Sequence, residues 1–375
     1  MILRELATRN FRNLEPERLE LHPDANVFVG ANGQGKTNLL EAIYFLSTTK
    51  SFRTTRVANL FRFDADHLFA EGVAEGDGLR KTLSIGIEAA ATRKRELLVN
   101  EQKSPLDQYV GQLPVIAYSS ARLEIIRGAP DERRRFLDRG IASLRPGYLS
   151  ALSKYQRTVE QRNALLRAVA EGDERESSLD AWDAELASTG AVVAAARAEF
   201  AAMLSSEFAK VVAEMRYHVD DLELRYEPSG AFLSDRGSVL SALERLRPRE
   251  LGAGFTIQGP HRDDLAFSIR GRDAAEVLSS GETKMTVLFL KLARVALYRE
   301  RAGRKPLFIF DDVDAELDLP VIERLMAFLC RGVQLFASSA KDEVLSRLDL
   351  GAHVRIPVAA GRAGTPLLSD LSEEH

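Results

Sequence analysis

A glycine-rich segment near the start of the chain is the first candidate for chemistry. Residues 30–37 read GANGQGKT, which has the spacing G-x-x-x-x-G-K-T of a phosphate-binding loop. The segment follows the apolar run 26–29 and precedes a helical pattern, as this motif requires. Glycines let the backbone approach a phosphate closely, and the N–H groups at a helix start face the anion. The segment predicts a nucleoside triphosphate site, whereas the alternative is a glycine-rich turn with a chance lysine.

Two side chains of this loop have predicted roles of their own. Lys36 would reach the β and γ phosphates as a point charge, and the Thr37 hydroxyl would take one coordination position on Mg²⁺. We therefore expect ATP and Mg²⁺ as cofactors. The residues predicted to bind the nucleotide are Gly30, Ala31, Asn32, Gly33, Gln34, Gly35, Lys36, Thr37 and Asn38.

A second candidate is the pair of acids that follows the apolar run 307–310. Such a run is typical of a buried parallel strand, whose C-terminal end carries acids to a ligand. In this Walker B interpretation Asp311 holds Mg²⁺, and Asp312 positions or deprotonates the attacking water. Lys36 and Asp312 are thus the predicted catalytic residues. Two carboxylates that merely end a strand at the surface are the alternative.

The third candidate is the segment LSSGE at residues 278–282, directly before the amphipathic stretch 283–299. A serine and a glycine at a helix start can bind an anion. In ABC-type ATPases such a signature acts in trans on the γ-phosphate held by the other subunit. An ordinary capping box is the alternative, but the order of the three motifs favours the ABC type. The predicted signature residues are Ser279, Ser280, Gly281 and Glu282.

These motifs need sheets to position them, and the sequence pattern supplies two regions of strands. Residues 1–118 predict a mixed sheet, and the sheet resumes from about residue 251. Between them, residues 119–250 carry two apolar stripes at helical spacing, separated by breakers at 172–178, which predict a helical hairpin. Lys36 and Gly281 are 245 residues apart (281 − 36), too far for a compact transporter ATPase and too close for the arms of SMC proteins.

The predicted fold class is therefore α/β. We expect an ABC-type P-loop ATPase head with a mixed sheet, formed by a discontinuous lobe of residues 1–118 and 251–375. An inserted, mainly helical second lobe would comprise residues 119–250. Composition agrees, because 375 residues with 45% hydrophobic side chains suffice for a real core.

Composition also sets limits on location. No run approaches the 18 or more apolar residues of a membrane span, and Arg4 and Glu5 interrupt the start of the chain, which argues against a signal peptide. The single cysteine, Cys330, excludes an internal disulfide framework. We expect a cytoplasmic protein without a membrane partner.

Beyond these motifs, the chain closely resembles the RecF family of bacterial recombination mediators, which are small relatives of the SMC-type ABC ATPases. The resemblance runs along essentially the whole chain. It rests on the segments 10–13, 33–42, 50–54, 128–138, 259–265 and 312–318. The arginine-rich segment 128–138 and the segment GPHRDDL at 259–265 are far more specific than the phosphate loop.

The sequence departs from related patterns at three places. Ser120 and Ala121 stand where the family usually carries a proline and an acid. The strand after Walker B leads into residues 338–340, where transporter ATPases place a histidine, so a γ-phosphate switch would be a hydroxyl or absent. That departure predicts slow turnover. Ser280 replaces the glycine of transporter signatures, a change that looks tolerable within this family.

The motifs predict an ATP-controlled clamp, because a lone subunit cannot supply its own signature. ATP would join two subunits head to head, and weak ATPase activity would release them. The resemblance implies the rest: recombinational repair and replication restart, binding to gapped DNA or single-strand/duplex junctions, and RecR and RecO as partners in loading RecA. A structural SMC-like tether is disfavoured by the short insert. An ATPase subunit of a defence or nuclease system is disfavoured by the absence of a second acidic cluster.

A net charge of −4 argues against nonspecific binding to DNA, so any DNA contact must use a local face. The candidates form two groups, which are Lys50, Arg53 and Arg56, and Arg133, Arg134 and Arg135. A solvated or ion-paired helix surface is the alternative for each group. In that alternative, the second group would pair with Asp131, Glu132 and Asp138.

Overall fold

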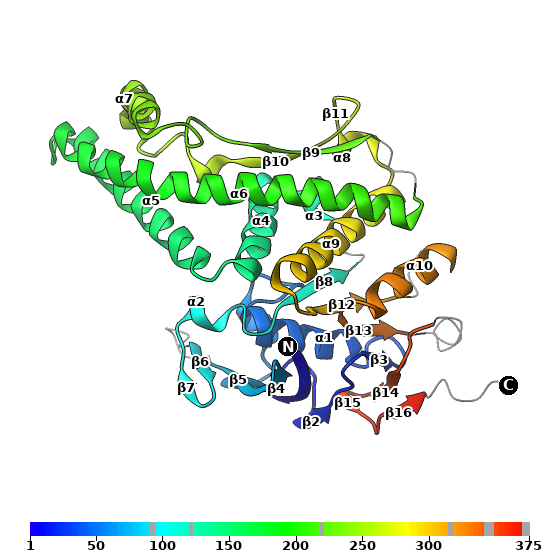
Figure 1. Cartoon of the computed structure of the whole chain (residues 1–375). Helices are drawn as coiled ribbons and strands as arrows, with labels where there is room; N and C mark the ends of the chain where they lie inside the picture. The colour runs from blue at the N-terminus through cyan, green and yellow to red at the C-terminus, as the bar shows by residue number, and fades with distance from the viewer. Residues whose placement is uncertain (90–94, 120–122, 218–220, 314–318, 341–348, 370–375) are drawn as a thin grey trace. The chain divides into compact units, whose positions relative to one another are not determined.

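The computed structural model describes residues 1–89, 95–119, 123–217, 221–313, 319–340 and 349–369. The chain folds into two compact units, each assembled from segments that are distant in the sequence (Figure 1). Unit 1 comprises residues 1–122, 210–217 and 284–375, and Unit 2 comprises residues 123–209 and 218–283.

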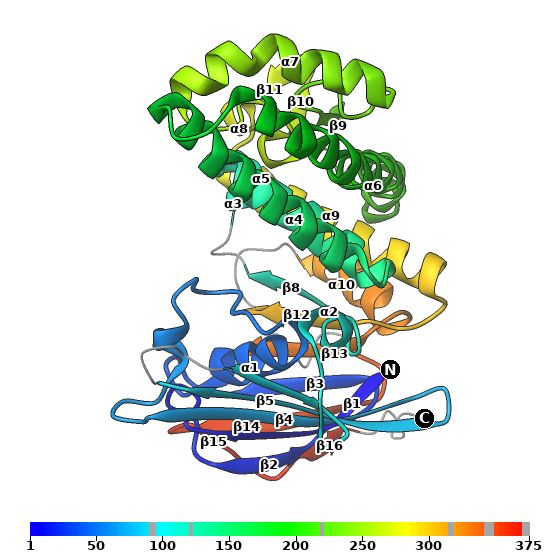
Figure 2. The ribbon, with the colours of Figure 1, turned by 90° about the vertical axis from the view of Figure 1, so that its left-hand side faces the viewer.

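Unit 1 contains two sheets. The first is antiparallel, and its strand order is β2 (Glu17–Glu20), β1 (Ile2–Arg9), β4 (His67–Gly76), β5 (Leu79–Glu88), β6 (Arg95–Val99) and β7 (Gln102–Lys103). Over residues 67–72, β4 alternates buried residues with more exposed ones, as expected where one face of the sheet meets the core. In Figure 2 the long strands β4 and β5 run side by side.

The second sheet carries the candidate motifs. Its strand order is β15 (Arg362–Ala363), β14 (His353–Ala359), β3 (Ala25–Val29), β13 (Gln334–Ser339), β12 (Leu307–Asp311) and β8 (Val115–Ser119), and β16 (Leu367–Ser369) also pairs with β14. The strands from β14 to β8 are parallel to one another. The carboxyl ends of β3, β12 and β13 therefore meet at one edge, and these ends lead into the phosphate loop, Asp311 and Ser338.

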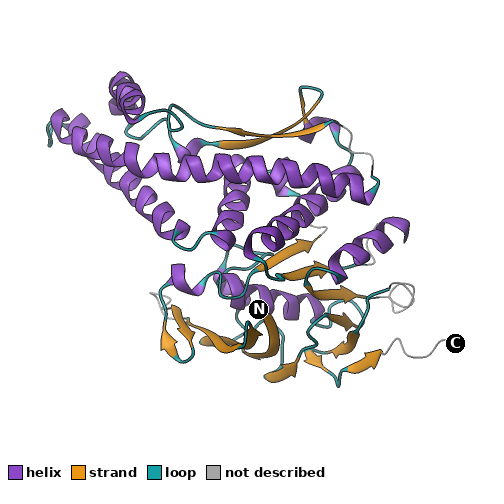
Figure 3. Cartoon of the chain, viewed as in Figure 1, coloured by secondary structure: helices purple, strands orange, loops and turns teal. Residues whose placement is uncertain are grey.

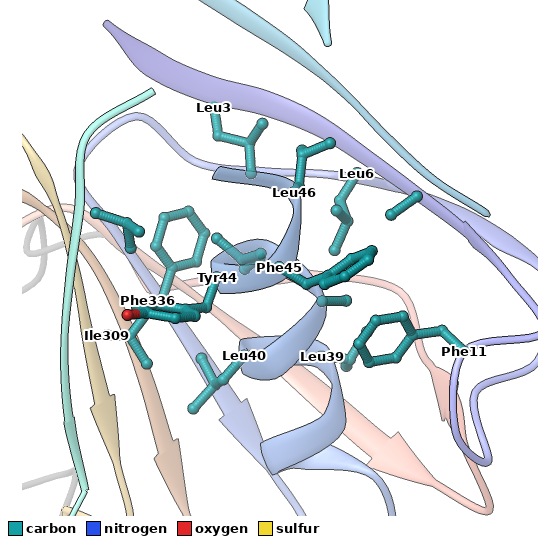
Figure 4. Close-up of a cluster of buried hydrophobic side chains, with 14 of the residues drawn as sticks. Leu3, Leu6, Phe11, Leu39, Leu40, Tyr44, Phe45, Leu46, Ile309 and Phe336 are labelled. Carbon is teal, nitrogen blue, oxygen red and sulfur yellow. The ribbon is translucent and has the colours of Figure 1, made fainter. Parts of the chain in front are cut away.

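Helix α1 (Lys36–Thr48) begins at the phosphate loop and contacts strands of both sheets. It is buried over most of its length because its side chains are apolar on nearly every face. Figure 4 shows Leu3 and Leu6 of β1 beside this helix, together with Ile309 of β12 and Phe336 of β13. Truncating one of these buried leucines to alanine would cost about 2–5 kcal/mol. This packing holds the start of α1 at the edge where the motifs converge.

A buried glutamine ties the two sheets together. Gln334 of β13 accepts a hydrogen bond from the backbone N–H of Leu3 and donates one to its carbonyl oxygen, both at 2.7 Å. The same amide donates to the carbonyl of His22 at 2.8 Å. Because a buried amide must satisfy its donors and acceptor, these bonds set the register of β1 against β13.

The remaining short elements of Unit 1 lie around these sheets. They are η1 (Val57–Leu60), α2 (Leu106–Tyr109) and α10 (Leu319–Cys330), with the larger part of α9 (Ser280–Ala302) and the end of α6 (Leu179–Met215). Among the helices in the described part of the chain, none combines the length and the apolar character needed to cross a membrane.

Unit 2 is mainly helical (Figure 3). Its other helices are α3 (Glu124–Arg127), α4 (Pro130–Leu144), α5 (Tyr148–Glu171), η2 (Glu176–Ser178), α7 (Arg236–Ala253), η3 (Pro260–Arg262) and α8 (Ala274–Val277). The stripes at 152–169 and 182–203 lie on α5 and α6, and α5 ends at Gly172, which adopts the left-handed conformation of a C-cap. The expected fold class, an α/β head with a mainly helical second part, is confirmed.

A buried charge network joins three helices of this unit. Arg162 of α5 is 0% exposed, and it donates to Asp183 of α6 at 2.6 Å and to Glu250 of α7 at 2.7 Å. A buried guanidinium of this kind is tolerated because its nitrogens are paired and hydrogen bonded with two acidic side chains. Removing Arg162 alone would leave the buried Glu250 carboxylate without its cation, at a cost of about 3–5 kcal/mol, whereas Asp183 would keep Arg247 at 2.6 Å.

The division of the chain differs from the expected boundaries. Residues 251–283, which the sequence pattern assigned to the ATPase lobe, lie in Unit 2. The reason is a separate antiparallel sheet, in which β10 (Asp264–Ile269) pairs with β9 (Leu222–Glu227) and with β11 (Arg272–Asp273). The apolar alternation of β10 would suit pairing with β9 or with a sheet of Unit 1 equally well. The pairing partner could therefore not be predicted from the sequence.

Candidate nucleotide site

The phosphate loop leaves β3 at Gly30, where the backbone takes a conformation that only glycine adopts readily. Its φ is +156°, and a Cβ at this position would lie 2.3 Å from the carbonyl oxygen of Val358. Gly35, immediately before α1, has a φ of +114° and serves as the N-cap. These two glycines are therefore required by the fold of the loop itself, independently of any ligand.

Lys36 holds a positive charge within this loop. Its Nζ donates to the carbonyl oxygens of Gly30 at 2.5 Å and Ala31 at 2.9 Å, and the side chain is largely buried. Helix α1 begins at Lys36, so its first backbone N–H groups lie in the same corner. The ammonium and the helix start together give this corner the positive field that a polyphosphate needs.

The turn between β14 and β15 forms hydrogen bonds to Gln34 of the phosphate loop. The Gln34 side-chain oxygen accepts a hydrogen bond from the backbone N–H of Ala360 at 2.7 Å, and the Gln34 carbonyl accepts one from Gly361 at 2.8 Å. Gly361 in turn accepts a hydrogen bond from the backbone of Glu15 at 3.0 Å. No local pattern links Gln34 to residues more than 300 positions later, so this support could not be predicted from the sequence.

Asp311 is joined to the phosphate loop through a hydroxyl. Thr37 Oγ1 donates to Asp311 Oδ1 at 2.9 Å, and Ser338 Oγ of the neighbouring strand donates to the same oxygen at 2.8 Å. Burial raises the pKa of Asp311 above its ordinary value, although the hydrogen bonds from Ser338 and Thr37 oppose this rise. Ser338 was considered in the sequence only as a γ-phosphate switch, yet it binds the Walker B acid.

Asp312 has different surroundings from its neighbour. Its side chain is exposed, whereas Asp311 is 7% exposed. The backbone at Asp312 is left-handed, with a φ of +63°, and its N–H donates to Ser338 Oγ at 2.8 Å. Two adjacent carboxylates are thus separated into a buried group and an accessible one, which is how proteins give two acids two roles.

The donor set at this corner fits Mg²⁺. The Thr37 hydroxyl and the Asp311 carboxylate present oxygen ligands within 2.9 Å of each other, and Mg²⁺ prefers oxygen. Burial disfavours the ionised form of Asp311, so a divalent cation beside it would offset that cost. These two residues are the ones predicted from the sequence as metal ligands.

A polar cluster lies on α1 one turn beyond the loop. Glu41 is 0% exposed, and it accepts two hydrogen bonds from Arg12 at 2.8 Å, one from the Ser51 hydroxyl and a longer one from Arg53 at 3.4 Å. Arg53 also donates to the Asn38 side chain at 2.8 Å. Arg53, predicted as a DNA contact, therefore lies beside the predicted nucleotide residue Asn38.

The two other candidates of this group are on the same segment. Lys50 and Arg56 are exposed, and they lie on either side of Arg53 in the chain between α1 and η1. The segment 50–56 is anchored by Ser51, whose hydroxyl accepts hydrogen bonds from the backbone N–H groups of Arg53 at 2.8 Å and Thr54 at 3.0 Å. The anchoring presents these cations from a defined backbone, although contact with DNA stays a prediction.

The signature segment lies in Unit 2 at the start of α9. The Glu282 carboxylate accepts from the backbone N–H of Ser279 at 2.9 Å, and Ser279 Oγ accepts from the N–H of Glu282 at 3.3 Å. These reciprocal bonds form a capping box. The hydroxyl of Ser279 still carries one donor hydrogen, and Ser280 and Gly281 are exposed. The capping and signature interpretations are therefore compatible.

All three arginines of the second group of DNA candidates are ion paired or hydrogen bonded within Unit 2. Arg133 forms a two-bond ion pair with Asp264 at 2.6 and 2.7 Å, and Arg134 donates to the carbonyl of Asp263 at 2.7 Å. Arg135 pairs with Asp131 at 2.8 Å and with Glu132 at 2.5 Å.

These contacts favour the alternative of ion-paired arginines. Only Arg135 has the partners expected from helical spacing, whereas Arg133 and Arg134 bind the segment 259–265. Asp138, the third expected partner, pairs instead with Arg197 at 2.8 Å. Ser120, Ala121 and residues 314–318 lie outside the described residues.

Comparison with known proteins gives the same picture of the whole chain. A family model described as the RecF/RecN/SMC N-terminal domain matches residues 2–358. A DNA replication and repair protein RecF of Streptococcus pneumoniae (strain CGSP14) is 35% identical over 354 residues, covering 93% of this chain and 95% of that protein.

Solved structures agree with these matches. One described as the recombination mediator protein RecF-ATP in the RecFOR pathway has a TM-score of 0.88 and 28% identity, covering 98% of this chain and 97% of that one. An Smc head bound to the C-terminal winged-helix domain of ScpA has a TM-score of 0.55 at 14% identity, covering 99% and 98%, which shows a likeness of fold alone.

Proposed function

Because this chain belongs to the RecF family of DNA replication and repair proteins, within the wider RecF/RecN/SMC N-terminal domain family, we propose that it is an ATP-controlled clamp on DNA. In this proposal ATP binds to the phosphate loop, two subunits associate head to head, and the dimer holds DNA. Slow hydrolysis of ATP then lets the dimer open. The relative whose structure is described as RecF-ATP supports ATP as the nucleotide.

The observation that carries the proposal is the junction of Lys36, Thr37 and Asp311 at one edge of the parallel sheet. Thr37 directly follows Lys36 at the start of α1, and its hydroxyl is bound to Asp311 at 2.9 Å. A lysine, a hydroxyl and a buried carboxylate at a glycine loop are the parts of a P-loop NTPase site. A strand end with two incidental acids would not require this hydroxyl-to-carboxylate contact.

Each residue has a distinct part in the proposed hydrolysis. Thr37 and Asp311 would hold Mg²⁺, which when bound neutralises phosphate charge. Lys36 adds a fixed positive charge where the reaction develops negative charge. Asp312, accessible and beside the buried acid, orients the attacking water and accepts its proton.

The signature supports action in trans. Apart from its chain neighbours and its own helix, a Cβ on Gly281 would meet no atom within 4 Å in the described part of the chain, so packing does not require glycine there. The open space suits the close approach of a phosphate held by another subunit. Ser279 offers its hydroxyl hydrogen and the exposed start of α9 offers backbone N–H groups.

The expectation of slow turnover gains support from Ser338. This hydroxyl stands near the place of the switch histidine of transporter ATPases, but it is engaged by Asp311 and by the backbone of Asp312. It therefore positions the Walker B acid. In such a site, bound ATP would keep the dimer closed, and hydrolysis of ATP would let the dimer open.

The DNA and the partners follow from the family. We propose gapped DNA or a single-strand/duplex junction as the ligand, RecR and RecO as partners, and RecA loading as the outcome. The name of the RecFOR pathway in the related structure supports the two partners. Lys50, Arg53 and Arg56 are the proposed DNA-facing cations, because all three are exposed on one segment, whereas Arg133 and Arg134 bind the segment 259–265.

Fluorescence anisotropy tests the DNA part. Labelled gapped, duplex and single-stranded DNA would each be titrated without nucleotide, with ADP and with ATP, at one salt concentration because phosphate contacts depend steeply on salt. The clamp predicts tight binding only with ATP, with gapped DNA preferred. Equal binding in all three nucleotide conditions would contradict it.

A further inference from the structure

Arg127 forms a hydrogen bond to the backbone immediately before Ser279 of the signature segment. Arg127 Nη2 donates a hydrogen bond to the carbonyl oxygen of Leu278 at 3.0 Å, and Leu278 directly precedes Ser279. The N–H of Leu278 donates to the carbonyl of Ala274 at 3.0 Å, and its side chain is buried. The peptide plane between Leu278 and Ser279 is thus held on both sides, because Arg127 binds its carbonyl oxygen and the Glu282 carboxylate binds its N–H at 2.9 Å.

Arg127 is itself held in place by a tight turn. It ends helix α3, which contacts α8 just before the signature. Gly128 follows, and its N–H donates to the carbonyl of Glu124 at 2.9 Å. A Cβ on Gly128 would lie 2.4 Å from that same carbonyl oxygen, so the turn leaves no room for a side chain.

The turn is joined to the sheet of Unit 2 by Arg133. Its Nη1 donates to the carbonyl of Gly128 at 2.8 Å, while its other nitrogens bind Asp264 at 2.6 and 2.7 Å. Burial would raise the pKa of Asp264, but the hydrogen bonds from Arg133 outweigh it and hold the pKa below its ordinary value. Asp264 is the first residue of β10, which pairs with β9 over its whole length.

Hydrogen bonds and one peptide bond, between Arg127 and Gly128, therefore link β10 to the signature, entirely within Unit 2. The link passes through Asp264, Arg133, Gly128, Arg127 and Leu278. We propose that Arg127 and Arg133 are positioning residues for Ser279, which orient the start of α9 toward the ATP of another subunit. This rests on the proposed in-trans role of the signature. It gives Gly128 and Arg133 of the segment 128–138, and Asp264 of the segment 259–265, a part in positioning the signature.

Two measurements on single variants separate positioning from a general structural role. Arg127→Ala should bind a fluorescent ATP analogue as a monomer with wild-type affinity, because the phosphate loop lies in Unit 1. Its ATP-dependent dimer, measured by sedimentation equilibrium, should be weaker by about tenfold or more, since a charged donor is lost. Arg127→Lys should restore part of the dimer, because an ammonium can still donate to the Leu278 carbonyl.

Arg135→Ala is the matched control. It removes an arginine of the neighbouring helix whose partners are Asp131 and Glu132, so it should leave the dimer unchanged. Loss of ATP affinity in monomeric Arg127→Ala, or a wild-type dimer in that variant, would overturn the inference. Failure of the wild-type chain to dimerise with ATP would instead overturn the proposed clamp, so the two failures are distinguishable.

Mixing variants tests action in trans directly. Arg127→Ala and Lys36→Ala should each hydrolyse little ATP alone. In a mixed dimer, the intact phosphate loop of the first variant faces the intact signature of the second, so one site of two is complete. Activity should recover toward half of the wild-type value for such dimers. Absence of any recovery at concentrations where mixed dimers form would contradict the assignment of Arg127 to the signature.

Discussion

Thr37 Oγ1 donates a hydrogen bond to Asp311 Oδ1 at 2.9 Å, although the two residues are 274 positions apart in the chain. The bond joins the phosphate loop after β3 to the acid at the end of β12, with β13 between the two strands. Ser338 of β13 binds the same carboxylate oxygen. Three strand ends thus converge on one buried carboxylate.

Lys36→Ala should weaken ATP binding by about two orders of magnitude, because a charged donor to the phosphates is lost. Isothermal titration of the monomer with ATP and Mg²⁺ would measure the change. Lys305→Ala is the matched control, since Lys305 pairs loosely with Asp24 at 3.7 Å on the surface of Unit 1. Unchanged affinity in Lys36→Ala would remove this lysine from the site.

Asp312→Asn should bind ATP with wild-type affinity and accumulate as a dimer. The amide keeps the shape of the side chain but cannot accept the proton of the attacking water. Hydrolysis should fall by about 10²–10⁴-fold, the usual contribution of a general base. Phosphate release at saturating ATP would measure it. Hydrolysis at the wild-type rate would assign the base to another residue.

Ser338→Ala should lower the free energy of unfolding by about 1–3 kcal/mol, because a buried carboxylate loses one of its donors. The loss should also move the pKa of Asp311 further upward, since the Ser338 hydrogen bond lowers it. More Mg²⁺ would then be needed for ATP binding at a given pH. Denaturant titration and Mg²⁺ titration would measure the two effects.

A buried serine elsewhere in Unit 1 provides the comparison for that variant. Ser84 of β5 donates to Glu71 at 3.2 Å in the antiparallel sheet. Ser84→Ala should cost some stability while leaving the Mg²⁺ requirement unchanged. If both variants shifted the Mg²⁺ requirement equally, Ser338 would have no specific link to the site.

Stability should fall between pH 7 and pH 5 because of His261. Burial lowers the pKa of His261 to about 4 from an ordinary value of 6.5. Tyr155 donates to its Nδ1 at 2.6 Å, and its Nε2 donates to the Thr256 carbonyl at 3.1 Å, so the folded chain holds the neutral ring.

The sign follows from proton binding. Between these two pKa values the unfolded chain binds a proton that the folded chain does not, so the free energy of unfolding decreases as the pH falls. The decrease should be about 2 kcal/mol between pH 7 and pH 5. Denaturant titrations at the two pH values would measure it. His261→Gln keeps an acceptor and a donor but cannot titrate, so its free energy of unfolding should not decrease in this way. The same decrease in the variant as in the wild type would contradict the role of His261.

Much of the fold was predictable because strong local patterns decided it. The continuous apolar run at 307–310 is a buried strand, and the stripes at 152–169 and 182–203 are helices. Strand partners were less predictable. Nothing in the residues of β10 distinguishes pairing with β9 from pairing with the sheet of Unit 1, because register and partner are tertiary choices.

The candidate site shows the same contrast. The glycine spacing and the acid pair indicated the phosphate loop and Asp311. The roles of Ser338 and Gln34 could not be read, because each acts through one long-range hydrogen bond. The charge of Arg133 suggested DNA, but its partner Asp264 is 131 positions away and neutralises it.

Sedimentation velocity of the wild-type chain tests the central claim most directly. Runs without nucleotide, with ADP and with ATP and Mg²⁺ would be compared at one protein and salt concentration, together with Lys36→Ala. The clamp predicts monomer in the first two conditions, dimer with ATP, and monomer for the variant throughout. Dimer in all conditions, or monomer with ATP, would contradict it.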